Sequence, residues 1–548
     1  MASVPSAMQR VPANDRSGRD AQDVVKELAA NELIFGVVGP VGSGTSEVAE
    51  ALSKFIGAED VEILKARDFI KEAADKLGIV IPREQGIEQT IALQDAGDAM
   101  RKAFGHASVA VGFAKKIREI RARRQGRDPE SESAITPDGK FRVYILDSLR
   151  HPAEVMLLRR IYQQSFCLIA VVCDEDVRVE RLADKYGSAG KNQIKSFMLR
   201  DEKASEKYGQ QVSSTFHLAD FFVENSQPRN LNGPGGLPQA NPNWTVQDEL
   251  GRLVSILRHD KIVRPRPNET AMYHAYGARM RSACLSRQVG AALLDRNGNL
   301  LATGTNEVPR AGGGVYGGSF DGFSDRDPDP AADHRCYIHG NYCRNTREQN
   351  DIIKDLSNAI TEIPNGDDEE FIRRVRGTRI GQLIEFSRAV HAEMDALFSA
   401  AREGVSTVGS RLFVTTYPCH NCARHIVVAG VDEVQFIEPY LKSRALPLHG
   451  DSITDRADGW IPPSEFMHVQ PEHRGRRAPQ VLFRPFTGVA PRMYRKAFYK
   501  DRDLKNGQTG AILEAFSEAE GEGVIDTLQL SYSDVEALLV GKGVRDVG

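Results

Sequence analysis

The sequence lacks the features of a membrane or secreted protein. None of its apolar runs approaches the roughly 20 residues that a membrane-spanning helix needs, and its first residues contain no signal-type apolar core. Only 7 of its 548 residues are cysteine, which is too few for a disulfide framework and indicates a reducing compartment. The formal net charge of −4 provides no overall positive field for nucleic acid. We therefore expect a cytoplasmic protein with no membrane contact and no DNA substrate.

No single hydrophobic core accommodates a chain of this length, so the sequence predicts several parts. Residues 1–28 are polar and are expected to form a loose, disordered tail. The segment 226–264 begins with prolines and glycines among polar residues and is predicted to be a linker. The expected domains are then 29–225 and 265–500, followed by a C-terminal extension over 501–548.

Two short motifs in the second domain carry groups suited to catalysis. A catalytic zinc ion takes three protein ligands and leaves its fourth position to water, and His391, Cys419 and Cys422 supply such a set. The metal lowers the pKa of that water, while Glu393 is placed to accept its proton and pass it to a departing amine. The pattern H-x-E followed by P-C-x-x-C is that of zinc-dependent base deaminases. A purely structural zinc site is the alternative, but it would need a fourth Cys or His and would not use Glu393.

The first domain carries a glycine-rich turn that lacks one residue of the phosphate-binding P-loop. A buried-strand run over 33–38 leads into the turn and a helix-like stretch follows it, an order that directs backbone N–H groups at a phosphate. Thr45 stands where the motif has lysine, so phosphoryl transfer is not expected. An acid at the end of a second strand run suits contact with hydrated Mg²⁺. The predicted nucleotide site comprises Gly39, Gly42, Ser43, Gly44, Thr45, Ser46 and Asp147; a loop kept only as a scaffold is the alternative.

Strand-like and helix-like runs alternate in the first domain, which predicts a parallel, doubly wound α/β sheet. With Arg150, Arg178, Arg181 and Arg200 following the P-loop, this domain resembles nucleoside monophosphate kinases. A basic run over 115–127 is followed by acidic residues and is expected to be a solvated helix face, with an RNA-contact surface as the alternative.

The sequence of the second domain predicts a mixed sheet flanked by helices. The pattern predicts a helix over 272–283, strands over 289–295 and 300–305 joined by an Asn-Gly turn, and helices over 384–400 and 422–429 that carry the zinc motifs. With a strand over 433–438, the order α-β-β-α-β-α-β is that of the cytidine deaminase fold, an α/β/α domain with a mixed sheet.

Four segments of this domain, 288–293, 304–309, 391–393 and 418–422, together resemble deoxycytidylate deaminases. A P-loop domain ahead of such a domain resembles the bacterial anti-phage dCTP deaminases. This resemblance implies zinc-dependent conversion of dCTP, dCMP or both to the uridine forms and ammonia, which deprives an infecting phage of dCTP. It also implies a homo-oligomer and a small regulatory RNA. The alternatives are a deaminase acting on cytosine in single-stranded DNA or RNA, and a nucleotide-sensing P-loop regulatory protein.

Further residues are candidates for substrate contacts. Asn306 resembles the family asparagine that binds the sugar, and an asparagine that only ends a strand is the alternative. Tyr417 is expected to stack on the pyrimidine, with a core aromatic as the alternative. Lys442 and Arg444 are candidates for the phosphates, which require cations, with solvated surface residues as the alternative. Glu307, directly after Asn306, is expected to face solvent.

An insertion before the zinc motifs packs four further metal ligands into a short stretch. Some deoxycytidylate deaminases carry a second, structural zinc in this region. A closed tetrahedral site can be built from His334, Cys336, His339 and Cys343. A polar loop that lines the substrate pocket is the alternative.

Overall fold

The computed structural model describes residues 30–57, 61–130, 133–187, 190–202, 208–233, 237–259, 261–317, 335–338, 342–359, 368–382, 387–440, 442–470, 478–500, 504–512 and 530–540. The chain divides into two compact units, the first running to Val263 and resuming at Lys500, the second spanning Arg264–Tyr499. The second unit is thus inserted into the sequence of the first. No helix in the described part of the chain has the length and apolar content to cross a lipid bilayer.

The first unit is built on a sheet in which five strands run parallel in the order β5-β4-β1-β3-β2. The predicted parallel α/β architecture is therefore confirmed. The strands are β1 (Glu32–Val38), β2 (Val61–Lys65), β3 (Arg142–Asp147), β4 (Phe166–Val172) and β5 (Phe221–Glu224). The helices between them are α2 (Thr45–Ile56), α3 (Ala66–Leu77), α4 (Ile87–Phe104), α5 (Ser108–Arg124), α6 (Pro152–Tyr162), η3 (Gln163–Ser165), α7 (Glu175–Tyr186), α8 (Lys191–Glu202) and α9 (Val212–Phe216).

The strand order creates a switch point at the centre of this sheet. The chain leaves β1 toward β2 on one side and leaves β3 toward β4 on the other. The connections that follow β1 and β3 therefore run in opposite directions from the carboxyl ends of these strands, which leaves a crevice between them. Open α/β sheets bind their ligands in such a crevice. The glycine-rich turn follows β1 and Asp147 ends β3, so both border this crevice.

The segment 226–264, expected to be a linker, contains a short hairpin and a packed helix. The hairpin pairs β6 (Asn230–Asn232) with β7 (Pro238–Ala240). Helix α10 (Val246–Arg258) packs on α2 and β5 and buries Leu250, Leu253 and Val254. These apolar residues recur at helical spacing and give α10 one buried face, so it belongs to the first unit.

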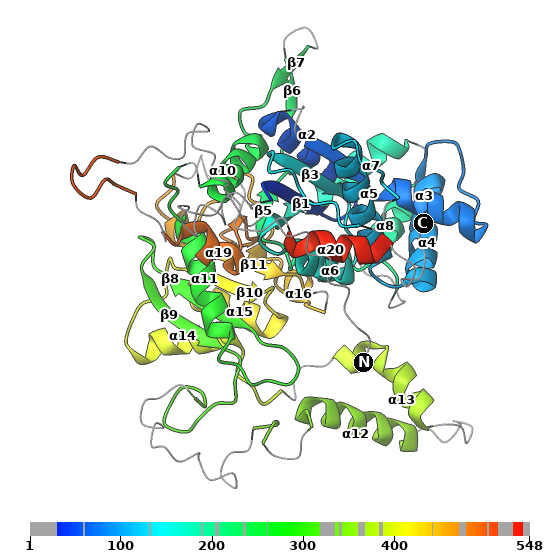
Figure 1. Ribbon diagram of the computed structural model, residues 1–548. Helices are drawn as coiled ribbons and strands as arrows, with labels where there is room; N and C mark the ends of the chain where they lie inside the picture. The colour runs from blue at the N-terminus through cyan, green and yellow to red at the C-terminus, as the bar shows by residue number, and fades with distance from the viewer. Residues whose placement is uncertain are drawn as a thin grey trace. The chain divides into compact units, whose positions relative to one another are not determined.

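The C-terminal segment also returns to the first unit. Helix α20 (Leu530–Val540) packs against α5 and α6 (Figure 1). Beneath it Arg121 is fully buried and pairs with Glu32 at 2.7 Å and with Glu536 at 2.5 Å. The expectation of a solvated face over 115–127 is wrong for Arg121 and also for Arg118, which is buried and bonds main-chain carbonyls. Arg121 is buried because the distant C-terminal helix covers it, whereas Arg123, Arg124 and Arg127 of the same run are exposed.

The second unit holds a mixed sheet in the order β12-β13-β11-β10-β8-β9. Strands β8 and β9 form the predicted hairpin, β10 runs antiparallel to β8, and β11, β13 and β12 continue parallel. The strands are β8 (Gly290–Leu294), β9 (Leu300–Thr305), β10 (Arg411–Thr416), β11 (Glu433–Glu438), β12 (Ile453–Thr454) and β13 (Val481–Pro485), with β14 (Gly488–Val489) after them. The helices are α11 (Pro267–Arg279), α12 (Arg344–Ala359), α13 (Asp368–Arg376), η6 (Arg379–Gln382), α14 (Ala392–Arg402), α15 (His420–Val428), α16 (Ala445–His449), α17 (Pro463–Phe466) and α19 (Pro491–Phe498).

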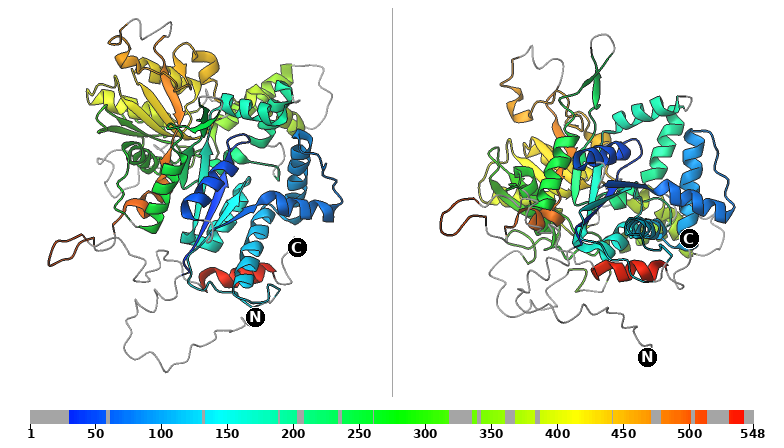
Figure 2. Two further views of the ribbon diagram at one scale, coloured as in Figure 1. Left: turned by 90° about the horizontal axis from the view of Figure 1, so that it is seen from above. Right: turned by 45° about the horizontal axis from the view of Figure 1, so that its top comes forward.

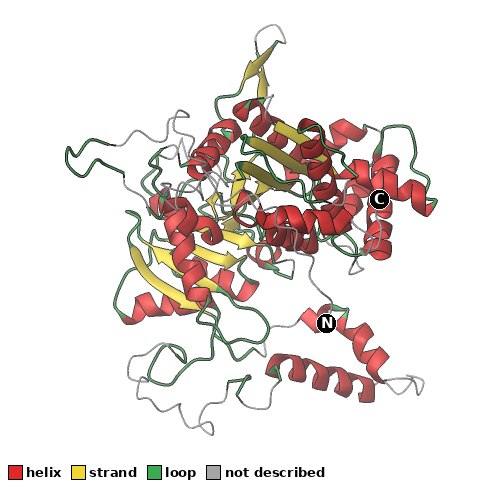
Figure 3. Ribbon diagram, in the orientation of Figure 1, coloured by secondary structure: helices red, strands yellow, loops and turns green. Residues whose placement is uncertain are grey.

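Two glycines let helices approach both faces of this sheet closely. A Cβ atom at Gly290 would lie 2.0 Å from the carbonyl oxygen of Ala275 on α11, and one at Gly304 would lie 2.1 Å from that of Ala392 on α14. Gly304 pairs with Ala291 across the hairpin, next to Gly290, so the two glycines face opposite sides of the sheet. The predicted three-layer α/β/α arrangement is therefore confirmed (Figures 2 and 3).

Candidate functional site

The two zinc motifs lie at the beginnings of neighbouring helices. Helix α14 starts directly after His391 and α15 starts directly after Cys419. The structure begins α14 at Ala392 rather than near 384, and Val390, just before it, forms an isolated β-bridge with Glu307. The apolar residues of both helices, with Cys419 and Cys422, are part of one core cluster over the sheet. The fold therefore fixes the spacing of the motif side chains.

The three predicted zinc ligands converge. The Nδ1 atom of His391 lies 3.2 Å from Cys422 Sγ and 3.4 Å from Cys419 Sγ, and the three ligand atoms are all within 4.8 Å of one another. A tetrahedral zinc with ordinary Zn–N and Zn–S bonds holds its nitrogen and sulfur ligands roughly 3.5 Å apart. The residues present thus fit one zinc ion and leave one coordination position to a small molecule.

The electrostatics of the cluster favour the thiolate that zinc requires. The hydrogen bond with Cys422, together with that of His391, lowers the pKa of the Cys419 thiol to about 4 against the effect of burial. The pKa of Cys422 is raised well above its usual value by its hydrogen bond to Cys419 and by burial. Burial opposes a charge on His391, but its contacts with Cys419 and Glu393 raise its pKa to about 9. Cys419 also caps α15 by accepting the Cys422 N–H, and a helix N-terminus further stabilises a thiolate.

Glu393 stands two residues after His391 and belongs to the same pocket wall. Its side chain is 4% exposed. Burial raises the pKa of its carboxyl to about 7, although the attraction of His391 opposes the shift. A carboxyl that gains and loses a proton near neutral pH is suited to move protons during a reaction.

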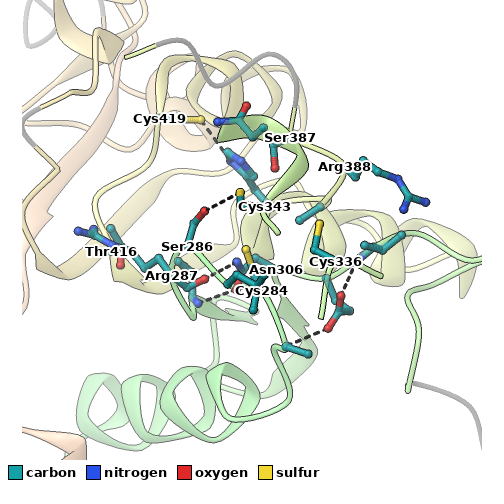
Figure 4. Close-up of a pocket in the computed structure, with 18 of the residues that line it drawn as sticks. Cys284, Ser286, Arg287, Asn306, Cys336, Cys343, Ser387, Arg388, Thr416 and Cys419 are labelled. Carbon is teal, nitrogen blue, oxygen red and sulfur yellow. Dashed lines mark hydrogen bonds between the residues drawn. The ribbon is translucent and has the colours of Figure 1, made fainter. Parts of the chain in front are cut away.

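One pocket of the second unit contains this cluster. Its wall includes His391, Glu393 and Cys419 as well as the predicted substrate residues Asn306 and Tyr417. Figure 4 shows the side chains of this pocket, which come from the strand entry at 283–289, from the insertion and from the zinc motifs. The structure therefore brings together segments that are far apart in the sequence.

Asn306 is held by the main chain beside the pocket. Its Oδ1 accepts the Val289 N–H at 2.6 Å and its Nδ2 donates to the Arg287 carbonyl at 2.7 Å. An amide has one further lone pair and one further N–H available after these bonds. Glu307, expected to face solvent, is buried and accepts the N–H groups of Ala283 and Val308, so it fixes the loop that presents Asn306.

Tyr417 joins the pocket to the core. Its ring packs edge-on against Phe436 at 4.7 Å and against Phe483 at 5.8 Å between ring centroids. The residue is only partly buried and lines the pocket. The same ring thus belongs both to the core and to the wall that a base would contact.

The positive charge of the pocket comes from residues that the sequence did not single out. Lys442 and Arg444 are exposed and are absent from the pocket wall, where they were expected to bind phosphates. Arg344, at the beginning of α12, has a buried Nε with no hydrogen-bond partner among the described residues. The four arginines of the wall are Arg287, Arg335, Arg344 and Arg388. Their spacing follows no motif, and only the fold of the insertion and of the strand entry brings them together.

The proposed second metal site is only partly described. His334 and His339 lie outside the described residues. Cys336 and Cys343 both line the pocket, and Cys343 Sγ lies 3.4 Å from Ser286 Oγ (Figure 4). The second zinc therefore stays a prediction.

In the first unit the glycine-rich turn and Asp147 lie together as predicted. Ser46 Oγ donates to Asp147 Oδ2 at 2.7 Å. Gly42 and Gly44 have φ angles of 84° and 85°, which an L-residue rarely adopts. Thr45, which replaces the lysine, is the first residue of α2. The turn thus lies beside Asp147, as expected, while phosphate binding by it stays a prediction.

Comparisons with known proteins include one family model, whose match lies in the second unit. The family described as "Cytidine and deoxycytidylate deaminase zinc-binding region" matches residues 265–438. The deoxycytidylate deaminase of Enterobacteria phage T4 is 26% identical over 181 residues, which are 32% of this chain and 79% of that protein. ComE operon protein 2 of Bacillus subtilis is 41% identical over 54 residues, 10% of this chain and 29% of that protein.

Among solved structures, the dCMP deaminase from the cyanophage S-TIM5 in complex with dCMP and dUMP is similar at 22% identity and a TM-score of 0.20, covering 34% of this chain and 91% of that one. The family match and the phage relative, together with the converging ligands, show that the second unit carries a zinc-type cytidine and deoxycytidylate deaminase domain. The chain is accordingly a hydrolase of the deaminase class.

Proposed function

We propose that this deaminase hydrolyses free deoxycytidine nucleotides, converting dCMP, dCTP or both to the uridine forms with release of ammonia. The observation that carries the proposal is a single pocket in which His391, Cys419 and Glu393 share a wall with four arginines. The substrate named for the phage T4 relative, deoxycytidylate, agrees with it.

The reaction exchanges the 4-amino group of cytosine for oxygen. A zinc ion held by His391, Cys419 and Cys422 supplies, when bound, a water of lowered pKa. Glu393 accepts the proton of the attacking water and gives a proton to N3 of the ring. It then takes the proton of the hydroxyl now on C4 and gives it to the amino group, which leaves as ammonia as the C4 carbonyl forms. Burial raises the pKa of this carboxyl, which suits a group that acts first as a base and then as an acid.

The remaining wall residues position the nucleotide. The free lone pair and N–H of Asn306 bind the sugar hydroxyl, and the ring of Tyr417 contacts the pyrimidine. The arginines of the wall, rather than the exposed Lys442 and Arg444, bind the phosphates. Guanidinium groups suit this role because they bind phosphate oxygens with paired, charge-assisted hydrogen bonds.

A substrate panel tests the proposal. Purified protein is incubated with dCMP, dCTP, CMP, CTP, deoxycytidine and adenine nucleotides, and with single-stranded DNA and RNA, and released ammonia and product mass are followed. We expect turnover of free deoxycytidine nucleotides and none of adenine nucleotides. Deamination of a single strand without turnover of any free nucleotide would contradict the proposal.

We also propose, on the resemblance to anti-phage dCTP deaminases, that the chain depletes dCTP during infection, that it self-associates and that a small RNA restrains it. Cells that carry the wild-type chain should show a fall in dCTP after infection, whereas cells that carry Glu393→Gln should not. Equal dCTP levels in the two strains would contradict the defence role while leaving the deaminase activity in place.

A further inference from the structure

The first unit contains a pocket of its own at the carboxyl ends of its parallel strands. Its wall includes Val41 and Ser46 of the glycine-rich turn, Asp147 of β3 and Lys65 of β2. Lys65 pairs with Asp147 in the register of β2 and β3, so both end at the crevice beside the turn. The deaminase reaction makes no use of this pocket.

A carboxylate of the chain occupies an anion position next to the turn. Asp201, on α8, is fully buried and accepts the Val41 N–H at 2.8 Å. It also forms an ion pair with the guanidinium of Arg150. A backbone N–H of such a turn and a guanidinium are the partners that a phosphate oxygen takes in nucleotide sites. Asp201 thus stands where a phosphate oxygen would bind.

The pocket wall supplies the positive charge that Thr45 lacks. Arg150 and Lys65 come from the segments that follow β3 and end β2. Arg101, also in the wall, is already paired with Glu154 at 2.9 Å. Among the cations of the wall, Lys65 and Arg67 are available to a phosphate, and so is Arg150 once Asp201 is displaced.

Buried polar atoms without partners point to a ligand independently of the turn. Gln94 is 5% exposed and its Nε2 donates to Gln210 at 3.3 Å, but its Oε1 has no hydrogen-bond partner among the described residues. Gln94 and Gln210 line the pocket together with Leu93 and Phe197. A buried amide oxygen without a partner is unfavourable, and an N–H group of a nucleobase would satisfy it. The apolar side chains of Leu93 and Phe197 offer a surface for the base.

Arg178, whose main chain adjoins the turn, also carries buried polar atoms without a partner among the described residues. Arg178, on α7, is 6% exposed, and its Nε and Nη1 have no hydrogen-bond partner in the part of the chain that the structure describes. A Cβ atom at Gly42 would lie 2.9 Å from the Arg178 carbonyl oxygen, so this arginine adjoins the loop. Its third nitrogen, Nη2, donates to Glu202 at 3.2 Å.

We propose that this pocket binds a nucleoside phosphate and that Asp201 competes with the phosphate for the position. On binding, the phosphate replaces Asp201 at the Val41 N–H and at Arg150 and gains Lys65, while the base contacts Leu93 and Phe197 and donates an N–H to Gln94. The site needs no lysine in the loop, because its positive charge comes from β2 and from the segment after β3.

Equilibrium dialysis with radiolabelled nucleoside mono- and triphosphates tests the proposal. All proteins carry Glu393→Gln so that no ligand is consumed. We expect Asp201→Asn to bind its preferred nucleotide at least tenfold more tightly and Arg150→Ala at least tenfold more weakly. Asp184→Asn, which changes an exposed acid on α7, is the matched control and should bind like the parent. Affinity for every nucleotide that is unchanged by both Asp201→Asn and Arg150→Ala would overturn the proposal.

Two further measurements distinguish binding at this pocket from binding at the deaminase pocket, and nucleotide recognition from phosphate binding alone. Binding that Arg287→Ala abolishes and Asp201→Asn leaves unchanged belongs to the deaminase pocket and counts against the proposal. Inorganic phosphate that competes as well as a nucleotide, with no effect of Gln94→Leu, overturns the base contact. Because none of these outcomes depends on ammonia release, failure here is distinguishable from failure of the deaminase assignment.

Hydrogen–deuterium exchange on the otherwise unaltered Glu393→Gln protein provides a test that does not require Asp201→Asn to fold. We expect a bound nucleotide to slow exchange of the amides over 39–47, which would then contact phosphate, and to quicken exchange over 191–202 as Asp201 is released. Exchange that is unchanged in both segments at saturating nucleotide would overturn the proposal.

Discussion

We expect activity to depend on proton transfer by the Glu393 carboxyl rather than on the size of its side chain. Glu393→Gln preserves the size and one hydrogen-bonding oxygen but cannot exchange a proton. We expect kcat for dCMP to fall by about 10²- to 10⁴-fold, the usual contribution of general acid–base catalysis. The zinc content and the melting temperature should stay unchanged. Glu403→Gln, an exposed acid just after α14, is the control. Ammonia release by Glu393→Gln at the parent rate would show that this carboxyl does not move the protons.

The ligand set makes a separate prediction about metal content. Replacing His391 by Ala or Cys419 by Ser removes one of three ligands from the cluster, so we expect zinc to be lost together with activity. Zinc per chain is measured by plasma mass spectrometry after dialysis. Cys173→Ser changes a free cysteine of the first unit and should retain full zinc. A fully loaded Cys419→Ser protein would show that the metal is held elsewhere.

The pocket arginines predict how phosphate is recognised. Arg287 lines the pocket, and its ion pair with Glu438 is long, at 3.8 Å. Loss of a charge-assisted contact typically costs about 1.5–3 kcal/mol, so Arg287→Ala should raise KM for dCMP roughly tenfold to a hundredfold. KM for deoxycytidine, which has no phosphate, should stay the same. Arg444→Ala is the control, and a larger effect of Arg444→Ala on dCMP would restore the assignment made from the sequence.

At the residue scale, the sequence predicted the groups that a motif defines and missed those that the fold assembles. His391, Glu393, Cys419 and Cys422 follow from spacing alone, because zinc chemistry restricts residue types and separations. The place of Arg344 in the pocket wall could not be predicted in this way, since this residue lies in an insertion that contains no motif. Glu307 follows Asn306 in the sequence, yet its burial depends on the N–H groups it accepts from Ala283 and Val308.

At the element scale, the position of α14 depends on its contact with β9. Gly304 allows this contact, since a Cβ atom there would lie 2.1 Å from the Ala392 carbonyl oxygen and 2.4 Å from the Ala396 nitrogen. Gly304→Ala should displace α14, which follows His391, at a cost of about 1–3 kcal/mol of stability. Activity should fall more than stability alone explains, because small misplacements of catalytic groups are costly.

Gly277→Ala is the matched control for that prediction. Gly277 lies within α11, and a Cβ atom there would meet no atom within 4 Å. Alanine is the better helix former by about 1 kcal/mol, so this variant should be as stable as the parent or more stable. Both variants are compared by urea unfolding and by the rate of dCMP deamination. Equal stability and activity of the two variants would show that α14 tolerates displacement.

The elements themselves were largely predictable from periodicity. Strands β9 and β11 have the bounds expected from the sequence, and β8 is one residue shorter than expected at each end. The segment 226–264 was predicted to be a linker because proline and glycine are frequent at its start, and the helix within it was not assigned to the first unit. The apolar face of α10 is buried by its contacts with α2 and β5. The sequence of the segment alone does not show which elements it packs against.

At the scale of the whole molecule, the chain closes its first unit with its own C-terminal segment. Arg121 lies 89 positions from Glu32 and 415 positions from Glu536 in the sequence, yet it bonds both. The hydroxyls of Tyr532 and Tyr162 donate to these two carboxylates at 2.8 Å. Local sequence patterns carry no information about contacts between residues so far apart in the sequence. The basic run was therefore predicted to be a solvated face.

Arg121→Met should therefore destabilise the first unit strongly, because it leaves two buried carboxylates without their cation. Breaking a buried ion pair in this way costs about 3–5 kcal/mol, measured as the loss of unfolding free energy in urea. Arg123→Met is the control, since Arg123 lies on the same helix but is 66% exposed and should change stability by about 0.5 kcal/mol at most. Proteolysis should also release the residues around α20 sooner in Arg121→Met than in the control. Equal stability of the two variants would mean that α20 is held by its apolar contacts alone and that the buried charges contribute nothing to closure.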